Sequence, residues 1–106
     1  MLEQFGNAME MIKKLQQNVA DMEDQLKHEQ VEVSSGDAVR VIMNGQQEVI
    51  DIEINAKYLS ADNSLLLQNL IVNTVNSAYT KSREMRQKAM DQLAGAMNLP
   101  KIPGLF

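Results

Sequence analysis

The sequence predicts an α+β fold in which two long helices flank a short antiparallel sheet. Apolar residues recur at helical spacing over roughly residues 3–28 and again over 62–97. Between them, the stretch 30–54 is rich in β-branched residues and contains two turn signals. The chain has 106 residues, which is enough for one domain, so residues 1–106 are expected to form a single domain.

The first predicted helix carries a heptad seam. Its apolar residues are spaced alternately three and four apart, and no proline interrupts them. This spacing is typical of a helix that packs along another helix, as in a coiled coil. The seam consists of Phe5, Ala8, Ile12, Leu15, Val19, Met22 and Leu26.

The middle of the chain is predicted to form a three-stranded antiparallel meander with one buried face. Residues 35–37 supply the first turn. Asn44 and Gly45 supply the second, because both residues tolerate a positive φ angle. In the last strand, alternation places three isoleucines on the face expected to be buried: Ile50, Ile52 and Ile54.

The second helix is predicted over roughly 62–97, with Ser60 or Asp62 able to cap its start. Residues 65–75 are apolar enough to cover the sheet, and beyond Ala78 the apolar face narrows to a seam. Two prolines in the tail, 98–106, prevent the helix from continuing, so the tail is predicted to be flexible.

The lengths of the two helices predict a partner. Helices in globular proteins average about 11–12 residues, and a sheet of six-residue strands spans only ~20 Å. Part of each seam therefore needs another surface, and a twofold homodimer is the commonest solution. The dimer and packing seam is expected to include Ile12, Leu15, Val19, Met22, Ala78 and Met85.

Chemistry-bearing residues are sparse. The sequence has no cysteine, and its one histidine, His28, ends the first helix, where a base complements the helix dipole. Asp51 and Glu53 fit a solvated outer face of the sheet, and no phosphate-binding or catalytic motif occurs. We therefore expect no catalytic residue, no metal, no cofactor and no enzymatic activity.

No stretch of the sequence is long and apolar enough to span a bilayer. The N-terminal segment lacks the basic start and the unbroken apolar core of a signal peptide. The expected location is therefore the cytoplasm, without a membrane partner.

The basic residues gather toward the C-terminal third although the net charge is −4. Four bases lie on the second predicted helix: Lys81, Arg83, Arg86 and Lys88. Lys13 and Lys14 lie on the first. Charge alone favours the plainer interpretation that these residues solvate exposed helices. In a dimer, two rigid basic helices at a fixed separation can also straddle duplex DNA and contact its phosphates.

Several segments, taken in order, carry a family resemblance. They are 13–17 (Lys-Lys-Leu-Gln-Gln), 39–41 with the turn 44–45, 48–54, 58–59, 67–78 and the proline-glycine ending 99–106. Together they resemble the YbaB/EbfC family of bacterial nucleoid-associated proteins.

This resemblance implies a tweezer-shaped, intertwined homodimer with helical arms that bind double-stranded DNA at low sequence specificity. It implies a role in nucleoid organisation or gene regulation, and it places Lys13, Lys14 and the bases of 81–88 on the arms. One alternative is a protein-interaction or chaperone-like coiled-coil module of the prefoldin type. Another is a scaffold for DNA-repair or replication proteins.

Overall fold

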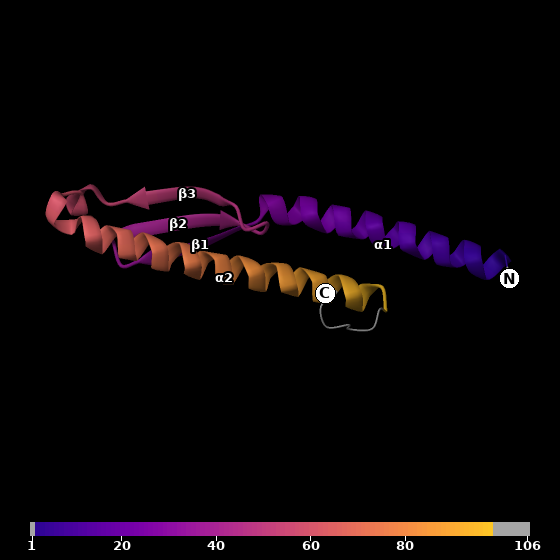
Figure 1. Ribbon diagram of the computed structural model, residues 1–106. Helices are drawn as coiled ribbons and strands as arrows, with labels where there is room; N and C mark the ends of the chain where they lie inside the picture. The colour runs from indigo at the N-terminus through magenta and orange to yellow at the C-terminus, as the bar shows by residue number, and fades with distance from the viewer. Residues whose placement is uncertain (1, 99–106) are drawn as a thin grey trace.

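Two long helices and a three-stranded sheet follow one another in the order helix, strands, helix (Figure 1). The computed structural model describes the backbone of residues 2–98 and the side chains of residues 5–98. The elements are α1 (Leu2–His28), β1 (Gln30–Ser35), β2 (Val39–Asn44), β3 (Val49–Ile54) and α2 (Ser64–Ala96). The predicted α+β element order is confirmed. All of the predicted flexible tail except Asn98 lies outside the described residues.

The sheet is an antiparallel meander with the strand order β1-β2-β3. Val41 in the central strand pairs with Val33 on one side and with Ile52 on the other. The pairing of β2 with β3 shifts between Ile42 and Met43, where a bulge leaves one extra residue in β3. The predicted meander is therefore confirmed.

One face of the sheet is covered by α2, but only over β1 and β2. Val39 and Val41 point to this face and are buried, together with Leu67 and Ala78 of α2. Ile54 and Ile52, their partners on β3, remain 36% and 39% exposed. The prediction that the isoleucines of the last strand are buried is thus wrong for the single chain, because α2 is too narrow to reach β3.

The arm α1 extends away from the end of the sheet, past the end of α2 (Figure 1). The described chain is correspondingly elongated, with extents of 72 × 23 × 16 Å. Burial along the predicted seam increases toward the sheet: Phe5 is 73% and Ile12 53% exposed, whereas Met22 and Leu26 are buried. The chain itself covers only the part of the seam nearest the sheet.

The start of α2 differs from the predicted cap. The chain enters the helix through a short 3-10 turn, Ala61–Asn63, and Asn63 precedes the helix without a side-chain cap. Ser60 stands before that turn, and its carbonyl accepts a hydrogen bond from the Asn63 N–H at 3.1 Å. The backbone of the turn therefore begins the helix in place of a Ser or Asp side chain.

Candidate nucleic-acid interface

Two hydrogen bonds distinguish the two sides of α2. Ser35, at the end of β1, shares a hydrogen bond with Thr74 at 2.5 Å. Gln47, in the turn between β2 and β3, donates from Nε2 to Ser82 Oγ at 2.9 Å. Lys81, Glu84 and Lys88 line one pocket together with Val31 of β1, so they lie on the side of α2 that we call the β1 flank. Because residues on a helix advance by about 100° each, we infer that Val72, Val75, Tyr79 and Arg86 lie on the opposite side, which we call the β3 flank.

The β1 flank of α2 forms a groove with α1. Lys81 and Lys88 both line it, two helical turns apart, with Glu84 between them. The apolar floor includes Met22 of α1 and Met85 of α2. The structure therefore brings together two of the predicted DNA-binding residues. Within residues 5–98, neither Lys81 nor Lys88 forms an ion pair, so both ammonium groups are available to a ligand.

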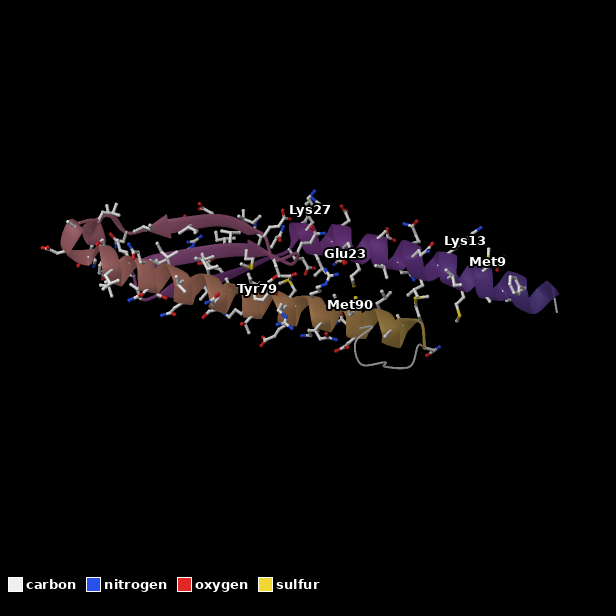
Figure 2. The ribbon with its side chains drawn as sticks, viewed as in Figure 1. Met9, Lys13, Glu23, Lys27, Tyr79 and Met90 are labelled. Atoms are coloured by element: carbon white, nitrogen blue, oxygen red, sulfur yellow. The ribbon has the colours of Figure 1, made fainter. Side chains whose placement is uncertain are left out.

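Lys13 lies on the distal half of α1, far from the sheet (Figure 2). Lys14 follows it in the helix, and both side chains are exposed. They line a second hollow, formed where the end of α2 approaches α1. At that point Asn18 Nδ2 donates to the Met97 sulfur at 3.4 Å. The two lysines thus continue the basic positions of the groove toward the tip of the arm.

The two arginines of α2 differ from each other. The Arg86 guanidinium forms a two-pronged ion pair with Glu23 of α1, in which Nη1 donates to Oε2 at 2.9 Å. The hydrogen bond from Arg86 lowers the pKa of Glu23, and the hydrogen bond to Glu23 raises the pKa of Arg86. Arg83 is exposed, and its guanidinium carbon lies 5.8 Å from the centre of the Tyr79 ring, which is cation–π range. Arg86 is therefore occupied within the chain, whereas Arg83 faces outward.

Sequence reasoning did not identify Glu23 as a partner of Arg86. A signal was present, because Glu23 directly follows the seam residue Met22. Charged positions beside a heptad seam commonly pair across to the neighbouring helix. The sequence did not show which basic residue pairs with Glu23, because that depends on how α1 packs against α2.

The predicted dimer seam is divided between covered and uncovered residues. Met22 and Ala78 are buried. Leu15, Val19 and Met85 are half-buried, and Ile12 is exposed. The β3 flank of α2 adds exposed apolar side chains, since Val72 is 57% and Tyr79 45% exposed. Ile52 and Ile54 of β3 are also exposed, so the strand and this flank of the helix both carry uncovered apolar side chains.

Within residues 2–98, no helix has an apolar stretch long enough to cross a membrane. The same residues contain no group of three His, Asp or Glu side chains placed to hold a metal ion.

Comparison with known proteins gives consistent results. The family model of the YbaB/EbfC DNA-binding family matches residues 1–97. A nucleoid-associated protein of Syntrophobacter fumaroxidans is 40% identical over an alignment of 103 positions that covers 94% of this chain and 94% of its own. A nucleoid-associated protein of Desulforamulus reducens is 38% identical and matches 96% of this chain and 95% of its own.

One solved structure has a similar fold. The crystal structure of an uncharacterized protein from Helicobacter pylori matches 86% of this chain and 97% of its own. The TM-score is 0.78 at 21% sequence identity, so the similarity concerns the fold alone.

Proposed function

Because this chain belongs to the YbaB/EbfC DNA-binding family, we propose that it binds double-stranded DNA as a homodimer with little sequence preference. The proposed role is nucleoid organisation or gene regulation in the cytoplasm, and association with the nucleoid is what the names of its relatives state. The observation that carries the proposal is the pair Lys81 and Lys88, which line one groove and form no ion pair within the described residues.

Lysine contacts to phosphate oxygens explain low specificity, because every DNA sequence presents the same phosphates. Lys81 and Lys88 form the centre of the proposed contact surface, and Lys13 and Lys14 extend it along α1. Arg83 adds an outward-facing charge on α2. Arg86 has a different role in this proposal: it holds the two helices together through Glu23. A local basic surface of this kind can bind DNA although the whole chain carries a net charge of −4.

The exposed apolar side chains of β3 and of the β3 flank of α2 form the proposed dimer interface. Ile52 and Ile54 on the strand, and Val72 and Tyr79 on the helix, are at least 36% exposed. Exposed apolar side chains on adjacent elements indicate an interaction site. The strand β3 is also an edge strand, whose free backbone groups otherwise favour aggregation. A second copy of the chain would cover both features.

The tip of α1 supports a second candidate function, that of a scaffold or chaperone-like module. Phe5, Met9 and Ile12 are spaced four and three apart and are 51–73% exposed. An apolar stripe on a projecting helix suits the binding of another protein, including a DNA-repair or replication protein. DNA binding does not need these side chains, so replacing them separates the two functions.

A salt titration of duplex binding tests the proposed function. The fluorescence anisotropy of a labelled duplex is measured between about 50 and 200 mM salt, where phosphate-dominated affinity falls steeply. In the variant with Lys81→Gln and Lys88→Gln, the slope of log K against log salt should decrease by about 0.9 for each lost phosphate contact. Two duplexes of unrelated sequence should bind the wild type equally.

The matched control is Lys27→Gln, because Lys27 lies on α1 outside the groove and is exposed. This variant should keep the wild-type slope. An unchanged slope in the double variant would remove Lys81 and Lys88 from the contact surface. Failure of the wild-type protein to bind DNA at low salt, together with suppression of client aggregation, would favour the second candidate function.

A further inference from the structure

The turn between β2 and β3 closes onto the end of α1. The Gly45 N–H donates to the Leu26 carbonyl at 2.8 Å and to the Glu29 carbonyl at 3.1 Å. A Cβ atom at position 45 would lie 2.7 Å from the Leu26 oxygen and 2.8 Å from a Leu26 methyl carbon. Only glycine therefore allows the turn to approach the helix this closely.

This turn also caps the end of α1. The last carbonyl groups of a helix lack partners within the helix itself. Here Asn44 Nδ2 donates to the Lys27 carbonyl at 3.2 Å, in addition to the bond from Gly45 to Leu26. One turn earlier, Gln46 Nε2 donates to the Glu23 carbonyl at 2.9 Å. The end of α1 is thus held by residues that follow it by 17 or more positions.

The same turn is also fixed to α2. Ser82 is fully buried, and its hydroxyl donates to the Asn44 carbonyl at 2.6 Å. Its oxygen accepts a hydrogen bond from Gln47 Nε2 at 2.9 Å. Asn44 itself is only 2% exposed, and its Oδ1 accepts from the backbone N–H groups of Gln46 and Glu48 at 3.0 Å. The five residues Asn44, Gly45, Gln46, Gln47 and Ser82, here the joint, therefore connect α1, the sheet and α2.

We propose that the joint sets the direction in which α1 projects, and that the proposed DNA binding depends on its rigidity. Close to the sheet, α1 is also held by the buried side chains of Met22 and Leu26 and by the ion pair of Glu23. Farther out, α1 meets α2 again where Asn18 Nδ2 donates to the Met97 sulfur at 3.4 Å, and sulfur is a weak acceptor. The arm is therefore a lever that is held most firmly at the end near the sheet. Lys14 is ~21 Å from the end of α1 at ~1.5 Å per residue, so a rotation of about 10° at the joint moves it by about 4 Å.

The consequence for DNA rests on the proposed function, but the role of the joint does not. This displacement exceeds the length of a hydrogen bond. Lys13 and Lys14 would therefore no longer reach the phosphates of a duplex that the lysines of the groove contact. The residues of the joint touch no DNA in this proposal and act as positioning residues.

Gly45→Ala tests the joint, with Gly95→Ala as the matched control because nothing lies within 4 Å of a Cβ atom there. Backbone amide hydrogen exchange is measured together with duplex affinity. In Gly45→Ala, amides in the last two turns of α1 should exchange about tenfold faster or more, and duplex affinity should fall by about tenfold. The Val41 amide in the sheet should keep its protection, and Gly95→Ala should leave both quantities unchanged.

Gln46→Ala is a milder variant that keeps the glycine and removes the bond to the Glu23 carbonyl. It should speed amide exchange in α1 and lower duplex affinity by smaller factors than Gly45→Ala. The proposal can therefore still be tested if Gly45→Ala fails to fold. The proposal would be overturned if the amides of α1 exchanged at the wild-type rate in both variants. Faster exchange in α1 with unchanged duplex affinity would overturn the link to DNA while leaving the proposed function intact. If the wild type binds no DNA, the proposed function fails, and the exchange rates still decide whether the joint holds the arm.

Discussion

Glu23 and Arg86 form an ion pair that joins the two long helices. Glu23 lies near the end of α1 that is closest to the sheet (Figure 2). The residues are 63 positions apart in the sequence, and both oxygens of the carboxylate receive an N–H group of the guanidinium. Their side chains are 30% and 35% exposed, so water still screens the pair. This ion pair holds α1 close to α2 and occupies a base that would otherwise be available to phosphate.

Glu23→Gln should weaken folding slightly and strengthen DNA binding. The loss of a partly solvated ion pair is expected to cost about 0.5–1 kcal/mol, measured by urea unfolding. Duplex affinity should rise, because a negative charge disappears and Arg86 is released. Asp24→Asn is the control, since this exposed neighbour makes the same charge change without touching Arg86. Equal gains in affinity in the two variants would show that Arg86 contributes nothing once it is released.

The stabilisation by the ion pair of Glu23 with Arg86 should also be lost in acid. Arg86 lowers the pKa of Glu23, so the stabilisation is fully present above the ordinary glutamate pKa of about 4.3. It is lost as the pH falls through the lowered pKa of the folded state. The difference in urea midpoint between wild type and Glu23→Gln should therefore stay constant from about pH 7 to pH 5 and shrink below about pH 4. A difference that already shrinks near neutral pH would contradict this assignment.

Ile52→Asp should weaken the proposed homodimer. A carboxylate on the apolar surface must lose its hydration when the second copy packs, which we expect to weaken the dimer by about 2 kcal/mol, roughly thirtyfold. Sedimentation equilibrium measures the change. Ser34→Asp adds the same charge on an exposed residue of β1 and should leave the dimer intact. The fold of the chain should survive in both variants, because Ile52 is 39% exposed within the chain. A dimer as tight as wild type in Ile52→Asp would place the interface elsewhere.

Thr74→Val should destabilise the contact between α2 and β1. The buried Thr74 hydroxyl donates to the Leu70 carbonyl at 2.5 Å, so the hydrogen bond that it shares with Ser35 must come from the serine. Valine has nearly the same shape but leaves the Ser35 hydroxyl without its acceptor, at a cost of about 1–3 kcal/mol in unfolding free energy.

The control for that variant is Thr80→Val. Thr80 also donates to the carbonyl four residues earlier, at 3.1 Å from the Asn76 oxygen, but it is exposed. Water replaces its hydrogen bond, so urea unfolding should change by less than about 0.5 kcal/mol. Equal losses in the two variants would mean that the contact with Ser35 contributes nothing.

The helices and turns could be predicted because their signals are local. The three-and-four spacing from Phe5 to Leu26 lies within α1, and Asn44 with Gly45 stands at the predicted turn. The sequence did not reveal that this turn also caps α1. The positive φ angle of this turn, 62°, is at Gln47 and not at Asn44 or Gly45. Gly45 is required instead because the turn approaches Leu26 closely, and no local pattern indicates the position of Leu26.

By itself, the sequence determined the order of the elements, the alternation of the strands outside the bulge in β3, and the family, because periodicity and segment order depend only on neighbouring residues. The tertiary structure decided which faces of the elements are covered. Val41 and Ile52 point to the same side of the sheet, yet α2 buries only Val41. Arg83 and Arg86 are three residues apart on one helix, yet only Arg86 meets a carboxylate. In both cases the outcome depends on the position and width of another element, which no local pattern encodes.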